Sequence, residues 1–564
     1  MADNGPLYET DPLLDYLRRS VSAPVYDVAK RTPLEPAENL TRRLGTAIWL
    51  KREDLQPSFS FKVRGAYTCI HRLVSEQGLR SGVIAASAGN HAQGVARAAA
   101  RLDREADIVM PRTTPSIKVE AVRQLGARVH LVGDNYDEAC SHATTLSEER
   151  GRPFVHPFDN PDVIAGQGTI GLELLNQSAG PPGAVFMPVG GGGLLAGAGA
   201  VIRALSPETR IIAVEPEDAA CLKAALAAGH PVTLDRVGIF ADGAAVRRVG
   251  DNTFAVAQGL VDELVTVGSD EICAAMRDIF EDTRSLVEPA GAMAVAGIKR
   301  YLEDGGELTG DSIAINSGAN INFSRMGHVV ERAAMGRGEE ALLSVMIPEE
   351  RGSYLAFLKV LGSPAVTEFN YRYSDPEQAR VFIGLSLDGT RDEPDGTVHR
   401  LREAGYPVRD LSHNELARLH LRHMVGGRPP SAADHDAADD SSSEPPPKRQ
   451  VASERVVRFE FPERPGALLD FLGKLAGRWS ISLFHYRNHG AAYGRVLAGF
   501  FVEDREQDAF GEFLLATGYG FTDETDNPAY REFLAPAIAD RSSKPVAADT
   551  PLAVSANDLR ATGH

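Results

Sequence analysis

The stretch Ser60-Phe61-Lys62-Val63-Arg64-Gly65 marks a predicted junction between a turn and a helix. Lys62 follows an aromatic side chain and opens a helical pattern whose apolar positions include Ala66, Ile70 and Leu73. Burial and the positive end of a helix dipole both favour the neutral form of a lysine amine. A neutral, positioned amine suits Schiff-base chemistry with a carbonyl group, whereas most lysines at a helix start are simply solvated charges. The surrounding motifs decide between these two interpretations.

Outward from this stretch, between about residues 45 and 327, short β-branched runs alternate with helical patterns. Such alternation predicts an α/β fold with a mainly parallel, doubly wound sheet. In folds of this kind, binding sites gather at the carboxyl ends of the strands. The predicted strands lie at residues 83–86, 107–110, 128–132, 184–187, 210–214 and 312–316, and the predicted helices at 92–102, 117–125, 139–149, 194–205 and 219–228.

Three of these strands end in small or polar residues. The turn Ser87-Ala88-Gly89-Asn90-His91 and the tetraglycine Gly190-Gly191-Gly192-Gly193 each feed a helix, where free backbone N–H groups can hold an anion. Four glycines leave no side chain to block a phosphate, and a flexible linker is the less favoured alternative at such a position. Ser317, after the strand at 312–316, has a hydroxyl that could bond a ring nitrogen, although a turn role is the better interpretation of this residue taken alone.

A dinucleotide-binding site is a competing interpretation of the glycine turn. Gly191-x-Gly193-x-x-Ala196 fits a loose fingerprint, and Glu215 closes the next strand, where an acid could bind a ribose. The match is weak, because the fingerprint is expected after the first strand of its domain and this loop follows several βα units. The sequence has no Gly-Lys-Ser/Thr motif that would support a nucleoside-triphosphate loop.

Composition and charge restrict the class of protein. The 564 residues suggest about three to four domains, and the net charge of −18 argues against nucleic acid or an anionic membrane as a partner. The four cysteines lie far apart, which predicts buried reduced thiols and neither a zinc site nor a disulfide framework. Without an apolar run of membrane length or a signal-peptide pattern, the expected location is the cytoplasm.

The second part of the chain contains a repeat. Pro348-Glu349-Glu350-Arg351-Gly352 resembles Pro462-Glu463-Arg464-Pro465-Gly466, and Glu368-Phe369-Asn370-Tyr371-Arg372 resembles Leu483-Phe484-His485-Tyr486-Arg487. A βαββα-like unit is therefore predicted to be duplicated. The predicted domains are an α/β domain at 1–340, small α+β units at 341–425 and 454–536, a disordered acidic and proline-rich linker at 426–453, and a disordered tail at 537–564.

Together, these motifs resemble those of the serine/threonine dehydratases, which are fold type II pyridoxal-phosphate enzymes of the tryptophan synthase β family. The likeness covers about residues 20–335, and the duplicated unit resembles the paired ACT-like, ferredoxin-like regulatory domains of biosynthetic threonine deaminases. The resemblance implies that Lys62 carries pyridoxal 5′-phosphate and later acts as the base at the substrate's Cα. It also implies Phe61 beside the cofactor ring, Asn90 at its phenolic oxygen, Gly190, Gly191, Gly192, Gly193 and Leu194 at the phosphate, Ser317 at the pyridine nitrogen, Ser87, Ala88, Gly89 and His91 around the substrate carboxylate, and Glu288 and Gly243 in less defined roles.

An activity and its control follow from the same resemblance. L-Threonine would be dehydrated and deaminated to 2-oxobutanoate and ammonia, the first committed step of isoleucine biosynthesis, in a homotetramer. A neutral Ser317 at the ring nitrogen favours loss of the β-hydroxyl over racemisation or transamination, and the cofactor phosphate is the expected acid. Isoleucine would inhibit, and valine would oppose it, through residues of the two small units: Gly352, Tyr371, Arg372, Gly466, Tyr486 and Arg487.

Metal binding is expected to differ from that of the related serine racemases. In those proteins a glutamate, a backbone carbonyl four residues on and an acid six residues on hold a divalent cation. Here Glu215 and Ala219 fit the first two places, but Cys221 occupies the third. We therefore expect no obligatory metal site.

Several alternatives stay open from the sequence. The side-chain pocket that would separate a threonine dehydratase from a serine dehydratase, a racemase or a β-replacement enzyme cannot be identified. The chain could instead be an amino-acid sensor built on an inactive lyase, although a sensor has no need of Lys62, Asn90 and Ser317 together. The duplicated unit could also serve oligomerisation alone.

Overall fold

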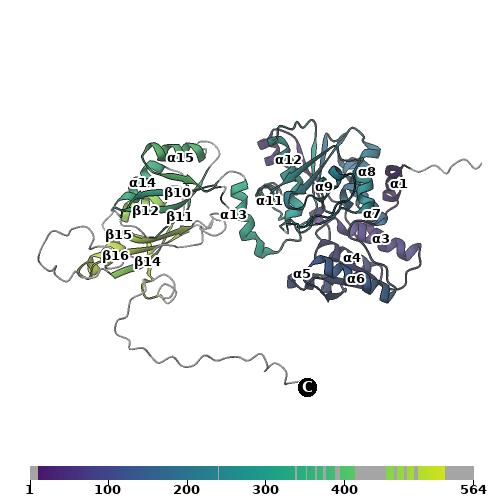
Figure 1. Cartoon of the computed structure of the whole chain (residues 1–564), viewed down its shortest axis with the longest axis horizontal. Helices are drawn as coiled ribbons and strands as arrows, with labels where there is room; N and C mark the ends of the chain where they lie inside the picture. The colour runs from purple at the N-terminus through teal and green to yellow at the C-terminus, as the bar shows by residue number, and fades with distance from the viewer. Residues whose placement is uncertain are drawn as a thin grey trace, which may run out of the picture. The chain divides into compact units, whose positions relative to one another are not determined.

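Two compact units make up the chain, Met1–Glu339 and Glu340–His564, so the break comes one residue before the predicted boundary. The computed structural model (Figure 1) describes residues 11–238, 240–336, 340–350, 352–362, 365–372, 377–387, 394–412, 414, 453–462, 467–475, 479–487 and 493–527. The predicted tail and all of the predicted linker except Ser453 lie outside the described residues. No helix in these ranges is both long enough and apolar enough to span a membrane.

A six-stranded sheet forms the centre of the first unit, with the strand order β1-β2-β9-β6-β7-β8. All neighbours pair in parallel except β1, which runs antiparallel to β2. This sheet confirms the predicted parallel α/β class. Its strands are β1 (Leu34–Pro36), β2 (Ile48–Arg52), β6 (Ala184–Pro188), β7 (Arg210–Pro216), β8 (Glu263–Val267) and β9 (Ser312–Asn316).

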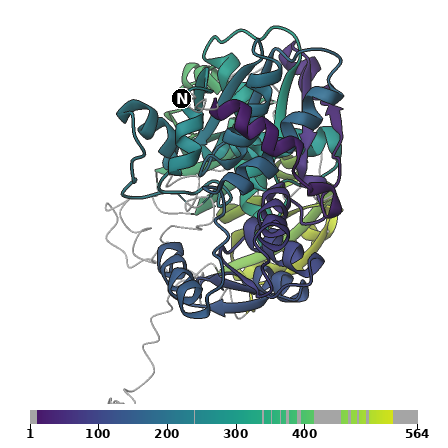
Figure 2. The ribbon, with the colours of Figure 1, turned by 90° about the vertical axis from the view of Figure 1, so that its right-hand side faces the viewer.

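Helices cover both faces of this sheet with two separate apolar clusters. One face holds α2 (Glu38–Leu44), α11 (Ser269–Thr283), α12 (Pro289–Glu303) and α13 (Met326–Gly336). The other face holds α1 (Pro12–Val21), α7 (Pro161–Gln177), α8 (Gly193–Leu205), α9 (Cys221–Ala228) and α10 (Asp251–Ala257). Figure 2 shows the purple helix α1, which packs against α7 and α8 on this second face of the sheet.

A second, three-stranded parallel sheet separates from the first, with the order β3-β4-β5. The sequence predicts these strands but not this division, because a β-branched run does not reveal its pairing partner. The segment folds as one insertion whose neighbouring strands pair only locally along the chain. It consists of β3 (Val83–Ala86), β4 (Ala106–Met110), β5 (Arg128–Leu131), α3 (Lys62–Ser75), α4 (Asn90–Arg101), α5 (Ser116–Gln124) and α6 (Tyr136–Arg150).

Local capping chemistry sets several helix ends in the first unit. The Asn160 side chain accepts the N–H groups of Asp162 and Val163, and Pro161 takes the first helical position of α7, where its missing N–H costs nothing. The helix α6 begins at a capping Asn135 and ends at Gly151, whose φ of 59° lies in the left-handed region. In contrast, α8 begins at glycines and has no side-chain cap.

The described residues of the second unit form one antiparallel sheet of eight strands, in the order β13-β10-β12-β11-β15-β16-β14-β17. Its helices pack into a single apolar cluster with the strands. Each repeat is a βαββαβ unit, one strand more than predicted. The first repeat contains β10 (Glu340–Pro348), α14 (Ser353–Leu361), β11 (Ala365–Arg372), β12 (Gln378–Ser386), α15 (Pro394–Glu403) and β13 (Val408–Asp410), and the second contains β14 (Ser453–Pro462), α17 (Ala467–Leu475), β15 (Ser480–Arg487), β16 (Tyr493–Val502), α18 (Gln507–Ala516) and β17 (Gly520–Asp523).

The two repeats join through antiparallel pairing of β11 with β15. Asn370 pairs with His485, its counterpart in the other repeat, while Phe369 pairs with Tyr486 and Tyr371 with Phe484. Equivalent residues therefore face each other across a local pseudo-twofold axis.

Candidate active site

Lys62 is the first residue of α3, which follows the carboxyl end of β2, a short 3₁₀ turn at Glu53–Leu55 and the loop 56–61. Its amine donates to the backbone oxygen of Pro157 at 3.0 Å and lies 5.3 Å from the centre of the Phe61 ring. Within the described residues the amine makes no ion pair. Burial lowers the pKa of Lys62 to about 8, although the Glu288 carboxylate opposes this shift.

The segment after β9 holds the approach to Lys62 in place. Phe61 donates its N–H to the Ser317 oxygen at 3.2 Å, and Ser60 bridges to Gly318. The Ser317 hydroxyl is buried and donates to the Ala290 oxygen at 3.2 Å. The predicted lysine and the predicted ring-nitrogen partner are thus brought together by backbone pairing between two distant parts of the chain.

The turn after β3 brings Asn90 into a chain of side-chain hydrogen bonds. The Asn90 amide donates to Glu288 at 2.6 Å, and its oxygen accepts from Asn320 at 2.6 Å. Glu288 is 3% exposed, and burial, helped by Asp242, raises its pKa to about 7. A β-carbon at Gly243 would lie 3.4 Å from the same carboxylate, so this glycine lines the cluster. Ser87, Ala88 and Gly89 are half-buried at the turn before Asn90.

The tetraglycine turn joins β6 to the first turn of α8, which begins at Gly193. A β-carbon at Gly191 would lie 2.3 Å from the Phe158 ring, and Gly192 has a φ of +91°, so neither position accepts a side chain. The Thr253 hydroxyl stabilises the turn by donating to the Gly191 oxygen at 2.7 Å. Leu194 is buried behind the turn.

A short segment at 155–159, which no sequence motif marks, connects the lysine to this turn. His91 donates Nε2–H to the Val155 oxygen at 2.8 Å, and burial lowers the pKa of His91 to about 3. Asp159 accepts the first N–H groups of α10, whose Thr253 holds Gly191. The side chain of His91 thus faces this segment, so the carboxylate role predicted for this residue would fall to its backbone. No local motif marks residues 155–159; a histidine followed by proline is too common to signal a site.

The imidazole of His156 has a defined tautomer. Its Nδ1 accepts the N–H of Asp159 at 2.8 Å and that of Phe158 at 3.3 Å, so the hydrogen resides on Nε2. The ring lies edge-on to Phe158 with 4.6 Å between ring centres. Burial lowers the pKa of His156 to about 4, with a further contribution from Lys62.

A buried ion network lies beside Lys62. Arg64 donates to Glu53 at 2.7 Å and to Glu173 at 2.7 Å, and Lys51 donates to Glu173 at 2.7 Å. All four side chains are at most 4% exposed. Arg64 also donates to the Thr169 hydroxyl at 3.1 Å. The network fastens α3 to α7 through charges that balance each other.

The carboxylate of Glu215 is engaged by the start of α9, so it is not free to bind a ribose. Its carboxylate accepts the N–H groups of Leu222 and Lys223 at 2.7 and 2.8 Å, which caps α9. Burial raises its pKa to about 7. The Cys221 thiol lies 3.5 Å from the Gly190 oxygen. Among the described residues, no cluster of three histidine, cysteine or carboxylate side chains could hold a metal ion.

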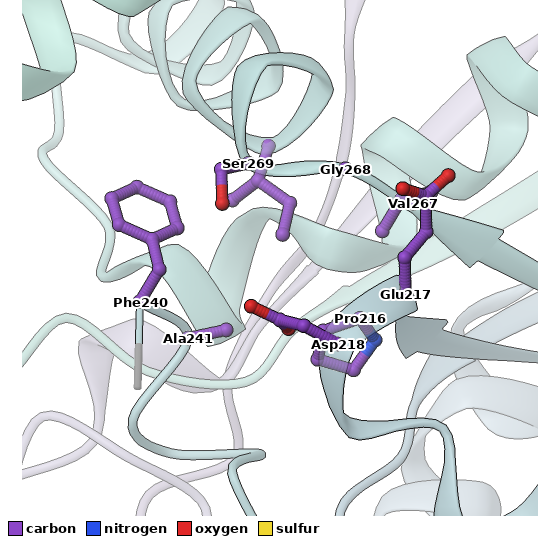
Figure 3. A pocket seen from close by; sticks show the side chains of 9 residues that line it. Pro216, Glu217, Asp218, Phe240, Ala241, Val267, Gly268 and Ser269 are labelled. Atoms are coloured by element: carbon purple, nitrogen blue, oxygen red, sulfur yellow. The ribbon is translucent and has the colours of Figure 1, made fainter. Parts of the chain in front are cut away.

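A small pocket of about 100 Å³ lies at the carboxyl ends of β7 and β8 (Figure 3). None of the predicted cofactor-binding residues lines it. Its walls are Pro216, Glu217, Asp218, Phe240, Ala241, Val267, Gly268, Ser269 and Ile272.

A second pocket, of about 140 Å³, lies in the second unit between the two repeats. The first repeat supplies Glu349, Glu350, Gly352, Tyr354 and Leu355, and the second supplies Leu472, Trp479, Ser480, Ile481 and Phe500. Gly352 precedes α14 with a φ of +90°, and the buried Tyr371 donates to Glu349 at 2.6 Å. Tyr486 is buried in the core. Gly466 and the side chains of Arg372 and Arg487 lie outside the described part of the chain.

The site around Lys62 has the features that pyridoxal phosphate needs. The glycine turn combines backbone N–H groups at a helix start with positions that only glycine can fill, which suits a phosphate. Lys62 supplies a buried amine, and Asn90 and Ser317 supply neutral polar groups. These residues follow the carboxyl ends of strands from both sheets, β2, β6 and β9 of the larger sheet and β3 of the smaller one.

Comparison with known proteins adds a family relationship. The family described as "Pyridoxal-phosphate dependent enzyme" matches residues 25–318, and "C-terminal regulatory domain of Threonine dehydratase" matches residues 331–421 and 448–534. The chain is 52% identical to L-threonine dehydratase biosynthetic IlvA of Escherichia coli over 95% of its own length and all of that protein.

Solved structures resemble the first unit. The processed form of threonine deaminase isoform 2 from Solanum lycopersicum matches with a TM-score of 0.56 and 50% identity, over 58% of this chain and 94% of that one. Maize serine racemase matches with a TM-score of 0.52 and 31% identity, over 56% and 96%. The fold of the first unit is therefore shared between different reactions on amino acids.

Proposed function

The chain belongs to the pyridoxal-phosphate-dependent threonine dehydratase family, and from this premise we propose that it dehydrates and deaminates L-threonine to 2-oxobutanoate and ammonia. This reaction is the first committed step of isoleucine biosynthesis. Similarity over the whole length of the Escherichia coli relative, with the regulatory domain included, supports threonine dehydration over the racemase and sensor alternatives.

The observation that carries the proposal is the state of Lys62. Its amine has a carbonyl partner and no carboxylate within ion-pair distance among the described residues, and burial brings its pKa to about 8. About one-tenth of the amine is therefore neutral at pH 7. A neutral amine can attack a carbonyl and can accept a proton, and a sensor needs neither property.

The remaining residues would bind and orient. Gly190, Gly191, Gly192, Gly193 and Leu194 would hold the cofactor phosphate, Phe61 would pack beside its ring, and Asn90 and Ser317 would bond its oxygen and nitrogen. Bound pyridoxal phosphate supplies an electron sink that acidifies the substrate's Cα–H. Lys62 would remove that proton, while the turn Ser87-Ala88-Gly89 and the His91 backbone would bind the substrate carboxylate.

Regulation by branched-chain amino acids is the second part of the proposal. The pocket between the repeats combines apolar walls, including Leu355, Leu472 and Ile481, with the acidic groups of Glu349 and Glu350. This lining suits an apolar side chain together with an ammonium group. We propose that isoleucine inhibits from this pocket and that valine opposes it, with Gly352 at the wall and Tyr371 holding Glu349. Arg372, Gly466, Tyr486 and Arg487 stay predicted effector residues.

A steady-state assay tests both parts. The purified protein is supplied with L-threonine or L-serine, with and without isoleucine, and 2-oxo acid release is measured. We expect threonine to be the better substrate and isoleucine to raise the threonine concentration at half saturation. Absence of 2-oxobutanoate would contradict the activity, whereas turnover unaffected by isoleucine would contradict only the regulation. Sedimentation in the same buffer tests the predicted homotetramer, and the expected cytoplasmic location stays a prediction.

A further inference from the structure

The reaction proposed above leaves one chemical requirement without a protein group. The β-hydroxyl must depart from Cβ, and oxygen gathers negative charge as the Cβ–O bond breaks. Elimination removes the Cα proton and this hydroxyl, which together make one water molecule. A hydrogen-bond donor aimed at the departing oxygen would stabilise that charge.

His156 is a donor of the right kind beside Lys62. The carbonyl of the next residue, Pro157, binds the Lys62 amine at 3.0 Å, so the imidazole and the amine belong to one local unit. The N–H groups of Phe158 and Asp159 occupy Nδ1, which leaves Nε2–H as the free end of the ring. In the described part of the structure, Nε2–H has no acceptor from the protein.

The segment that carries His156 is held from several directions. The Val155 oxygen is bound by His91, the Phe158 ring packs on the glycine turn, and the Asp159 carboxylate caps α10. The His156 ring is also fixed edge-on against Phe158. A donor held in this way needs no reorganisation during the reaction.

From this geometry we infer that the Nε2–H of His156 donates a hydrogen bond to the β-hydroxyl of the substrate. The inference rests on the proposed function. Lys62 takes the Cα proton, the Cα–H electron pair becomes the Cα=Cβ bond, and the Cβ–O pair leaves with the oxygen. The Lys62 ammonium then returns its proton to that oxygen, in place of the cofactor phosphate that the family resemblance implies as the acid, while His156 stays neutral throughout.

Neutrality gives this donor a property that a charged one lacks. With a pKa of about 4, His156 keeps the same hydrogen on Nε2 across the physiological pH range. It therefore adds no positive charge beside the Lys62 amine, which has to remain a base.

Two matched variants separate the donor from the structural role of the ring. In His156→Asn, the amide oxygen can replace Nδ1 as the acceptor for the backbone N–H groups, but the donor at Nε2 is lost. In His156→Gln, the longer side chain can place an amide N–H near the Nε2 position, while the Nδ1 acceptor is lost. Turnover is compared for L-threonine and β-chloro-L-alanine, whose chloride leaves without a hydrogen-bond donor.

We expect His156→Asn to lower kcat for threonine about 10²-fold while turnover of β-chloroalanine falls less than about threefold. His156→Gln should recover part of the threonine rate relative to chloroalanine. Equal losses with both substrates, or no loss with either, would overturn the inference. Weakened binding of pyridoxal phosphate without a change in the substrate ratio would also overturn it, since His156 would then contact the cofactor.

A binding measurement makes the same test without turnover. In the Lys62→Ala background, equilibrium titration compares L-threonine with L-2-aminobutanoate, which lacks only the hydroxyl. Adding His156→Asn should reduce the preference for threonine about three- to tenfold, the value of one hydrogen bond. An unchanged preference would contradict a contact with the hydroxyl. A wild-type protein that releases no 2-oxo acid would instead contradict the proposed function.

Discussion

Lys51 and Lys62 are both enclosed by the first unit, eleven positions apart, yet they lie in opposite surroundings. Lys51 donates to Glu173, to the Gln177 side chain and to the Thr32 oxygen, at 2.6 to 2.9 Å. Lys62 has a single carbonyl as its partner among the described residues. Burial lowers the pKa of both; Glu53 and Glu173 oppose that shift at Lys51, and Glu288 alone opposes it at Lys62. Lys62 thus differs from Lys51 in making no direct ion pair among the described residues, although the Glu288 carboxylate still acts on it.

The largest effect should come from removing Lys62, which makes no ion pair among the described residues. Lys62→Ala should lower threonine turnover by about 10⁴-fold or more, because the base and the attachment point are lost together. Release of 2-oxobutanoate measures the loss, and the thermal unfolding midpoint should stay close to that of the wild type. Residual turnover within tenfold of the wild type would contradict the assignment.

Breaking the buried ion network of Arg64, Glu53 and Glu173 should lower the stability of the first unit and should not alter its chemistry directly. Arg64→Met leaves Glu53 and Glu173 with an uncompensated charge, so the free energy of unfolding of the first unit should fall by about 3–5 kcal/mol. Denaturant titration of the full chain, followed by a probe in the first unit, gives the value. The surface variant Arg128→Met, which loses a 3.3 Å contact to Asp107, serves as the control and should cost less than about 1 kcal/mol.

These two lysines also show how far sequence reasoning reaches. Lys62, the glycine turn and Ser317 can be picked out as local features near strand ends, but their cofactor roles are implied only by the family resemblance. The Arg64 network is not, because Glu173 is distant in the chain and only the packing of α3 on α7 brings it close. The proposed role of His156 is not predictable from sequence for a similar reason. It depends on the tautomer that the N–H groups of Phe158 and Asp159 select. The division of the first unit into two sheets is not predictable from sequence, because the composition of a strand does not show which strand it pairs with.

The pH dependence of cofactor binding provides a finer comparison. Lys62 becomes neutral as the pH rises through about 8, so the association rate of pyridoxal phosphate with the apo-protein should increase over that range. At pH 7 about one-tenth of the amine is neutral, and the rate should be about tenfold below its plateau. Stopped-flow absorbance measures it. A rate that is flat between pH 6.5 and 9 would mean that Lys62 is not the titrating group.

The smallest effect should come from neutralising Glu288, the carboxylate that raises the pKa of Lys62. Glu288 raises the pKa of this lysine and is itself mostly ionised at pH 8, since its own pKa is about 7. Glu288→Gln should therefore move the midpoint of cofactor association to lower pH, by up to about one unit. Glu288→Asp keeps the charge and should shift the midpoint less. A shift to higher pH would have the wrong sign for a Coulomb interaction.

The pairing of β11 with β15 joins the two repeats of the second unit through two similar strands. Because Asn370 faces its counterpart His485, each of these strands is paired with a near-copy of itself running the other way. A fragment containing only the first repeat would expose an edge that is complementary to the same edge on another molecule. Such a fragment should form a homodimer through β11, in which two copies of one strand replace the β11–β15 pair of the present chain.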